Sequence, residues 1–208
     1  MGRVGNPVKL QELIQNFDIK NFVETGSGNG TSMNDVFQLN LVEKLYGIEL
    51  NIPLYEDLKN NFNGIYFYNG YSKDELPNLL NDLNPNPTLY WLDAHFPFSE
   101  YQFNNPYDSE PDVTKRIPLE IELRIIKENR DVSKDIFIMD DLRIYVDRPY
   151  TAGNWDMRNI AGYEGYDFVE EILGDTHVII EHHGDEGYLL AYPILYSEEE
   201  IKSTIRFL

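Results

Sequence analysis

Short apolar runs alternate with amphipathic segments along most of this 208-residue chain. Apolar runs of about four to eight residues are typical of strands, and segments with apolar residues at helical spacing are typical of the helices that connect parallel strands. Strands are expected at 21–25, 44–50, 65–68, 88–94, 135–139, 177–182 and 187–193. Helices are expected at 7–17, 31–40, 53–61, 73–83, 118–129 and 165–173. The alternation predicts an α/β fold with a mainly parallel sheet and helices on both faces.

The last two expected strands are joined differently from the others. Only the segment 183–187 lies between them, whereas a parallel crossover needs about a dozen residues or more. They must therefore form an antiparallel hairpin at the end of the sheet. A dinucleotide-binding fold does not end in this way, so the hairpin argues against that fold.

The length of the chain fits one α/β domain, residues 1–208, in which residues 1–20 form a helical lead-in. Two long segments, 96–117 and 146–162, have no regular pattern. Both follow the carboxyl ends of expected strands, where open α/β sheets bind their ligands. We therefore expect these two segments to line the substrate side of the site.

The charge of the chain restricts its partners. The 36 acidic residues against 17 basic ones give a formal net charge of -19, which repels nucleic acid phosphates and favours a small neutral or cationic molecule. No apolar stretch approaches the roughly 20 residues of a membrane span, and the N-terminus lacks the apolar core of a signal peptide. We expect no membrane contact and a cytoplasmic location.

A glycine-rich turn follows the first expected strand. Residues 24–30 read Glu-Thr-Gly-Ser-Gly-Asn-Gly, and a helix then begins at Thr31 or Ser32. Because glycine lets the backbone approach a ligand closely, we expect the cofactor to contact Glu24, Gly26, Ser27, Gly28, Asn29 and Gly30. Dinucleotide-binding turns have two residues between the second and third glycines, and this turn has one. The spacing favours S-adenosylmethionine over NAD.

Two later turns provide the remaining expected cofactor contacts. Glu49 ends the second strand 21 residues after Gly28, close to the separation at which a ribose-binding acid occurs. Its carboxylate is expected to accept hydrogen bonds from the ribose hydroxyls. The third strand ends just before Tyr71 and Ser72, and we expect an adenine ring to lie against that turn.

Residues 21–145 resemble the class I S-adenosylmethionine-dependent methyltransferases. The segment 24–30 looks like the first motif of that family, Glu49 like its ribose-binding acid, and the turn 70–72 like its adenine-contacting turn. The C-terminal hairpin extends the resemblance almost to the end of the chain. One departure is Tyr71, where the family commonly has an acidic residue. The resemblance implies a Rossmann-like, seven-stranded methyltransferase fold with S-adenosylmethionine as cofactor.

Polar residues follow the fourth and fifth expected strands: Asp93 and His95 after one, Asp140 and Asp141 after the other. Neighbouring strands lie about 4.8 Å apart, so Asp93 and one or both of Asp140 and Asp141 could share a hard cation such as Mg²⁺ through carboxylate oxygens. The arrangement is similar to that of metal-dependent small-molecule O-methyltransferases, which carry an Asp and then an Asp-Asn pair at these places. Sugar-modifying methyltransferases are a related alternative. Consecutive strand residues face opposite sides, so both Asp140 and Asp141 can reach the site only if the strand has ended.

The expected reaction is attack of a substrate hydroxyl on a methylsulfonium group. His95, whose unperturbed pKa is about 6.5, is expected to take the hydroxyl proton, and Asp93 to position the cofactor or substrate. One alternative is a metal-independent N- or O-methyltransferase in which Asp93 and His95 only orient the acceptor. The others are an NAD-linked enzyme and a non-catalytic binding or assembly protein.

The long segments carry aromatic and basic residues that are expected to select the substrate. These residues are Phe96, Phe98, Tyr101, Phe103, Tyr107, Arg148, Trp155 and Arg158. Aromatic residues are also enriched at protein interfaces, so the same segments would fit contacts between copies in a homo-oligomer.

Overall fold

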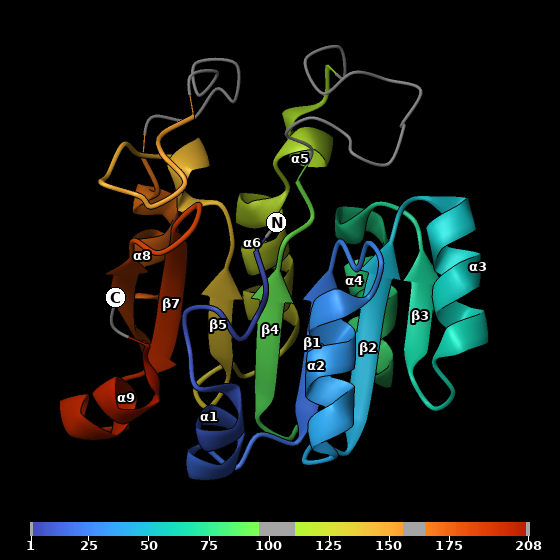
Figure 1. The fold of residues 1–208 in the computed structure, drawn as a ribbon, viewed down its shortest axis with the longest axis horizontal. Helices are drawn as coiled ribbons and strands as arrows, with labels where there is room; N and C mark the ends of the chain where they lie inside the picture. The colour runs from blue at the N-terminus through green and yellow to red at the C-terminus, as the bar shows by residue number, and fades with distance from the viewer. Residues whose placement is uncertain (1, 96–110, 156–164, 207–208) are drawn as a thin grey trace.

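The fold is built on one seven-stranded sheet, seen in a computed structural model that describes residues 2–95, 111–155 and 165–206 (Figure 1). Its strands are β1 Asn21–Thr25, β2 Lys44–Glu49, β3 Tyr66–Asn69, β4 Thr88–Leu92, β5 Ile136–Met139, β6 His177–His182 and β7 Tyr188–Pro193. Their order across the sheet is β3-β2-β1-β4-β5-β7-β6. The strands β1 to β5 are parallel, and β7 runs antiparallel to both β5 and β6.

The strand order changes direction between β1 and β4. The chain builds outward from β1 through β2 to β3, and then returns to place β4 on the other side of β1. Adjacent crossovers therefore leave the sheet on opposite sides at this point, which is where open α/β sheets bind their ligands. The carboxyl ends of β1 to β5 all lie at the same edge of the sheet (Figure 1), which we call the carboxyl edge.

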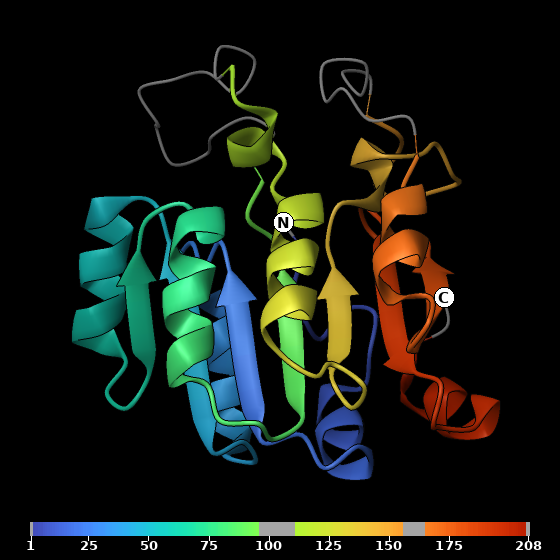
Figure 2. The same cartoon turned by 180° about the vertical axis from the view of Figure 1, so that it is seen from behind.

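Helices cover both faces of the sheet (Figures 1 and 2). One face packs against α4, α6 and α8, and the opposite face packs against α1, α2 and α9. The longer helices in the described part of the chain are α1 Leu10–Asn16, α2 Thr31–Leu39, α3 Ile52–Asn61, α4 Ser72–Asp82, α6 Leu119–Asn129, α8 Asp167–Leu173 and α9 Glu198–Thr204. Two short elements, α5 Val113–Arg116 and the 3₁₀ turn η2 Leu142–Ile144, lie near the carboxyl edge.

Alternating strand residues divide the core into two layers. In β4, Tyr90 and Leu92 pack with α4 and α6, whereas Leu89 and Trp91 pack with α1 and α2. Successive side chains of a strand point to opposite faces, so a strand buried on both sides reads as a continuous apolar run. This explains why the central strands were recognisable in the sequence.

The expected fold is confirmed, with small changes in its boundaries. The strands and helices agree with the expected ranges to within three residues at each end. The leading helix begins at Leu10 rather than at Pro7, because Val8 forms an antiparallel bridge with Ile205. The expected irregular segment 96–117 contains α5, which Asp112 caps by accepting the N–H of Thr114. No helix in the described part of the chain is long and apolar enough to cross a membrane.

Gly26 allows the turn after β1 to lie directly on the end of β4. Its φ is +74°, and a Cβ added there would be 2.4 Å from the backbone oxygen of Asp93. Gly64 has a similar φ of +90°, but a Cβ there would meet nothing within 4 Å. The two glycines therefore separate the effect of backbone conformation from that of a steric clash.

We predict that G26A destabilises the protein by about 1–3 kcal/mol more than G64A. Both substitutions impose the left-handed conformation on alanine, and only G26A also forces the turn away from Asp93. Urea denaturation of the two variants measures the difference. Equal losses of stability would mean that the close approach of the turn to β4 contributes nothing.

Candidate active site

Five groups of residues expected to form the site come together at the carboxyl edge. They follow β1, β2, β3, β4 and β5, and parallel strands place all of these connections at the same edge (Figure 1). The group after β1 adjoins the end of β4, because the N–H of Asp93 donates to the backbone oxygen of Thr25 at 3.2 Å. The predicted residues therefore lie around the carboxyl ends of β1 and β4.

Hydrogen bonds to the rest of the protein fix the conformation of the glycine-rich turn. Its three glycines have φ values of +74°, +52° and +72° at Gly26, Gly28 and Gly30. The N–H groups of Gly26 and Ser27 donate to the backbone oxygen of Ile48 at 2.9 and 3.0 Å. Asn29 is exposed. The buried Ser27 hydroxyl makes no aligned hydrogen bond among the described residues, although it lies near enough to Glu24 to lower the pKa of that acid.

Glu49 fixes the turn from the end of β2. Its carboxylate is 4% exposed and accepts the N–H of Gly28 and the N–H of Asn51, each at 2.7 Å. Burial raises the pKa of Glu49, and the two N–H groups offset part of that rise. Each carboxylate oxygen retains a further lone pair, so a ribose could bind to an acid whose orientation is already set.

Glu24, the last residue but one of β1, pairs with Gly47 of β2 and is also buried. Burial raises the pKa of Glu24 well above its usual value, and the nearby Asp93 carboxylate raises it further. Its Oε2 has no hydrogen-bond partner within the described ranges. A buried acid in this state is stabilised by a proton or by a cationic ligand.

The turn expected to contact adenine lies against Glu49. The N–H of Gly70 and the side-chain amide of Asn69 both donate to the backbone oxygen of Glu49, at 3.2 and 2.8 Å. Ser72 is buried at the start of α4. The Nζ of Lys115, from α5, lies 4.8 Å from the centre of the Tyr71 ring. The turn and α5 thus form a wall beside the expected ribose position.

An acidic cluster surrounds His95. Its Nε2 lies 3.1 Å from Asp93 Oδ1 and 3.0 Å from Asp141 Oδ2. One ligand atom from each of Asp93, His95 and Asp140 lies within 4.8 Å of the others. Both ring nitrogens lack an aligned hydrogen-bond partner in the described part of the chain, so we interpret the two short distances as charge contacts rather than as directed hydrogen bonds.

The consecutive acids both reach the cluster because β5 has already ended. The strand stops at Met139, and the N–H of Asp140 donates to the backbone oxygen of Leu92 at 3.1 Å. Asp141 then has a φ of +55°. This left-handed conformation turns the chain, so the alternation of strand faces no longer separates the two side chains.

The cluster carries an excess of buried negative charge. Burial raises the pKa of Asp140 well above its usual value, and Asp93 and Asp141 add to the rise. Burial also raises the pKa of Asp93. For His95, burial by itself lowers the pKa, but Asp141 and Asp93 outweigh it and the pKa is raised. These shifts all indicate that the cluster favours a proton or a metal cation.

Two residues near the cluster were missed in the sequence. Glu122 is 1% exposed on α6. Burial is the main cause that raises the pKa of Glu122, and the charges of His95 and Asp93 also act on it. A charged residue on a face otherwise formed by Leu119, Leu123 and Ile126 was the available signal. Arg143 donates from Nε to Asp141 Oδ1 at 2.9 Å, and no periodic pattern points to it.

The N-terminal segment 2–8 also closes the cluster, although only a helical lead-in was expected there. A Cβ on Gly2 would be 2.1 Å from Asp140 Oδ2. Val4 is fully buried, and its N–H donates to the Ser32 hydroxyl at 3.1 Å. Asn6 donates to Asp185 Oδ2 at 2.7 Å. This segment therefore crosses the carboxyl edge between α2 and the turn that joins β6 to β7.

Most residues expected to select the substrate cannot be placed. Phe96, Phe98, Tyr101, Phe103, Tyr107 and Arg158 lie outside the described residues. Trp155 packs against the core on the α4, α6 and α8 face. Arg148 was expected to meet an anionic or sugar-like group, but its guanidinium pairs with Glu181 through two hydrogen bonds of 2.7 and 2.8 Å.

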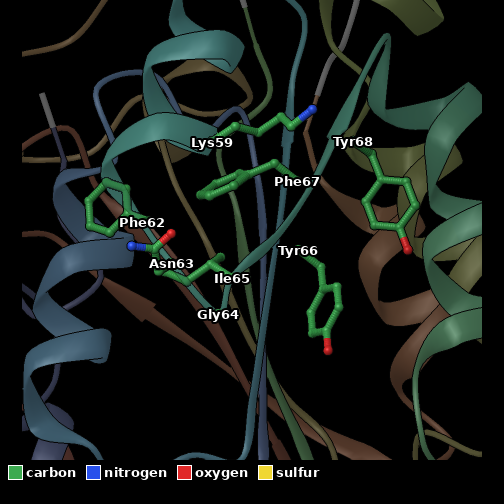
Figure 3. Close-up of a pocket in the computed structure, with 8 residues that line it drawn as sticks. All are labelled: Lys59, Phe62, Asn63, Gly64, Ile65, Tyr66, Phe67 and Tyr68. Atoms are coloured by element: carbon green, nitrogen blue, oxygen red, sulfur yellow. The ribbon is translucent and has the colours of Figure 1, made fainter.

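A hollow at the outer edge of the sheet is separate from this cluster (Figure 3). It has a volume of about 420 Å³ and is lined by Lys59, Phe62, Asn63, Gly64, Ile65, Tyr66, Phe67 and Tyr68. No residue that the sequence predicted for the site is among them. The lining contains no carboxylate, so we assign the chemistry to the carboxyl edge instead.

No family model and no curated protein sequence matches this chain. Solved structures resemble it. A Staphylococcus aureus protein described as a candidate caffeoyl-CoA O-methyltransferase has a TM-score of 0.59 at 14% identity, covering 88% of this chain and 80% of that one. The SAH-bound methyltransferase PaMTH1 of Podospora anserina gives 0.57 at 12% identity, with coverages of 88% and 76%. A spermidine synthase in complex with the transition-state analogue AdoDATO gives 0.55 at 12%, with coverages of 96% and 67%.

At these identities the likeness concerns the fold. The chain has the fold of the class I S-adenosylmethionine-dependent methyltransferases. A protein named as a spermidine synthase has it too. The reaction must therefore be argued from the residues of the carboxyl edge rather than from the sheet.

Glu122 provides a test of how burial acts at this edge. Burial raises the pKa of Glu122 from 4.5 to about 7, and the hydroxyls of Ser72 and Thr25 offset part of the rise. Because the folded state holds this proton more tightly than the unfolded state, the stability present below pH 4.5 is lost as the pH rises towards 7. Glutamine is neutral at every pH and should not show this loss.

We predict that, between pH 5 and pH 8, the wild-type protein loses about 2–3 kcal/mol more stability than E122Q. Chemical denaturation at the two pH values measures the difference. The matched control is E128Q, which changes an exposed residue of the same helix and should follow the wild type. If E122Q shows the same pH dependence as the wild type, Glu122 does not titrate in this range.

Proposed function

We propose that this protein, which has the class I methyltransferase fold, binds S-adenosylmethionine at the carboxyl edge and transfers its methyl group to a hydroxyl of a small molecule or sugar. The observation that carries the proposal is the pair of buried acids, Glu24 and Glu49, beside the glycine-rich turn. S-Adenosylmethionine has ribose hydroxyls, a cationic sulfonium and a cationic amino group, which match acids of this kind.

The cofactor fits the edge in one direction. Glu49 would accept the ribose hydroxyls, and the turn at Tyr71 and Ser72 adjoins Glu49 on the side where the adenine would lie. Glu24, whose buried Oε2 has no hydrogen-bond partner among the described residues, would accept the cationic amino group. The sulfonium would then point towards Asp93 and His95. Ser27, Gly28 and Asn29 would border the cofactor along the turn.

A divalent cation such as Mg²⁺ fits the cluster beside the sulfonium. Asp93 and Asp140 bring carboxylate oxygens close together in a buried place, and burial raises the pKa of both acids, which supports a cation there. Such a cation, when bound, lowers the pKa of an acceptor hydroxyl. Asp141 adjoins these two acids and was expected to be a further ligand of the cation.

His95 is the proposed proton acceptor. As the acceptor oxygen attacks the methyl carbon, its O–H bond breaks and the proton passes to a ring nitrogen of His95. The bond between the methyl carbon and sulfur breaks at the same time, and its electron pair neutralises the sulfonium to give S-adenosylhomocysteine. Asp93 and Asp141, at 3.1 and 3.0 Å from Nε2, stabilise the imidazolium that forms.

A metal-independent reaction is the second candidate, with an amine or hydroxyl as acceptor. It is favoured by the position of His95 between Asp93 and Asp141, because a protonated imidazole would itself neutralise those acids. In that case Asp93 and His95 only orient the acceptor. The cation experiment below distinguishes the two candidates.

We predict that the purified protein binds S-adenosylhomocysteine with a dissociation constant in the micromolar range or below, as measured by calorimetry. E49Q should weaken binding by about tenfold or more, since a ribose hydrogen bond to a buried charge is lost. The matched control is E43Q, an exposed acid just before β2, which should bind like the wild type. A folded protein that binds NAD but not S-adenosylhomocysteine would contradict the proposed cofactor.

We predict that the protein binds one Mn²⁺ ion, used as a paramagnetic substitute for Mg²⁺, and that D140N weakens this binding by about tenfold or more. The loss of the free Mn²⁺ signal in electron paramagnetic resonance measures the affinity. D147N changes an exposed acid after η2 and serves as the control. Equal affinities for D140N and D147N would favour the metal-independent candidate.

A further inference from the structure

The two consecutive acids after β5 are held by different groups. Asp140 has a carboxylate oxygen within 4.8 Å of ligand atoms of Asp93 and His95. Asp141 is engaged at both oxygens: Oδ1 lies 2.9 Å from Arg143 Nε, and Oδ2 lies 3.0 Å from His95 Nε2. Both Asp141 oxygens therefore have side-chain partners. Asp140 has none of these in the described part of the chain: its Oδ1 accepts the N–H of Asp141 at 2.9 Å, and its Oδ2 lies beside Gly2.

Arg143 is itself fixed by the turn between β6 and β7. Its N–H donates to the backbone oxygen of Glu186 at 3.2 Å, and its Nη2 lies 3.8 Å from Glu186 Oε1. The N–H of the preceding Leu142 donates to the backbone oxygen of Gly187 at 2.9 Å. The guanidinium is thus anchored from outside the cluster, and it holds Asp141 from that side.

The backbone at Asp141 is compatible with this arrangement and with a conservative test. Its φ of +55° lies in the left-handed region, which asparagine adopts about as readily as aspartate. Replacing Asp141 by asparagine therefore keeps the turn and the shape of the side chain. It removes the charge and replaces one acceptor oxygen by an NH2 donor.

The ion pair with Arg143 also changes the charge that a cation would meet. Arg143 cancels the formal charge of Asp141, so Asp93 and Asp140 supply the two negative charges that balance a divalent ion. A third unpaired carboxylate would leave the site with a net negative charge when a divalent ion is bound. The side chains of Asp141 and Arg143 are 8% and 22% exposed, so water screens this pair only partly.

We propose that Arg143 withdraws Asp141 from the cation-binding set and makes it the positioning residue of His95. The inference rests on the proposed function, since it concerns the cation and the proton acceptor of that site. Asp93 and Asp140 bind the cation, and Asp141 orients the imidazole. Arg143 keeps the Asp141 carboxylate from turning towards the cation.

The first test compares Mn²⁺ affinities of the full chain by electron paramagnetic resonance. D140N should weaken binding by about tenfold or more, whereas D141N should stay within about threefold of the wild type. The two variants remove the same charge from adjacent residues, so each is the matched control for the other. A loss in D141N as large as that in D140N would make Asp141 a ligand and overturn the inference.

The second test releases Asp141 from its partner. R143M should change Mn²⁺ affinity by about fivefold or more, because the freed carboxylate can join the cation. Adding D141N to R143M should restore the wild-type affinity. A double variant that behaves like R143M alone would show that Arg143 does not act through Asp141. If R143M does not fold, as judged by circular dichroism, the comparison of D140N with D141N decides alone.

A third measurement reports on the orientation of His95. The chain has four histidines, so the ring ¹⁵N resonances of His95 can be identified by their loss in H95Q. D141N should shift them, and the exposed D147N should not. Unchanged His95 resonances in D141N would contradict the positioning role.

These results separate the inference from the proposed function. A wild-type protein that binds S-adenosylhomocysteine but no Mn²⁺ overturns the cation and this inference, and leaves methyl transfer standing. A protein that shows the expected Mn²⁺ pattern but does not bind S-adenosylhomocysteine overturns the proposed cofactor, and leaves the roles of Asp141 and Arg143 standing.

Discussion

The close approach of the turn after β1 to the end of β4 is the contact on which the rest of the carboxyl edge depends. It is possible because Gly26 has no side chain, and a Cβ there would be 2.4 Å from the backbone oxygen of Asp93. The same contact brings Glu24 beside Asp93. Burial raises the pKa of Glu24, and the Asp93 carboxylate raises it further. Glu49 then holds the turn through Gly28. The positions of Glu24, Glu49 and Asp93 relative to one another thus depend on this backbone contact, at the point where the strand order reverses.

Buried carboxylates give this edge its chemical character and also reduce the stability of the fold. Glu24, Asp140 and Glu122 all have raised pKa values, chiefly because burial disfavours their charged forms. A chain selected for stability alone would have apolar or amide side chains at such positions. Their presence at one edge, around His95, is physically reasonable if a cationic ligand supplies the missing charge. The cationic cofactor and the divalent ion that we propose would both do so.

The second half of the cluster is organised by parts of the chain that are distant in sequence. The turn between β6 and β7 holds η2 through Leu142 and Arg143. It also receives Asn6 from the N-terminal segment, through Asp185. The hairpin that ends the sheet therefore serves a second purpose, because its turn sets the conformation in which Asp140 and Asp141 reach the cluster. The separate partners of these two acids then lead to separate roles.

The sequence by itself determined the strands, the crossover helices, the hairpin and the order of the acidic groups along one edge. These features depend on local periodicity, connection length and spacing, all of which are written along the chain. Only the tertiary structure decided that Gly2 covers Asp140, that Glu122 enters from α6, and that Arg143 holds Asp141 beside His95. Those relations join side chains across elements far apart in sequence, and they depend on packing and on one left-handed residue, for which no periodic pattern gives a signal.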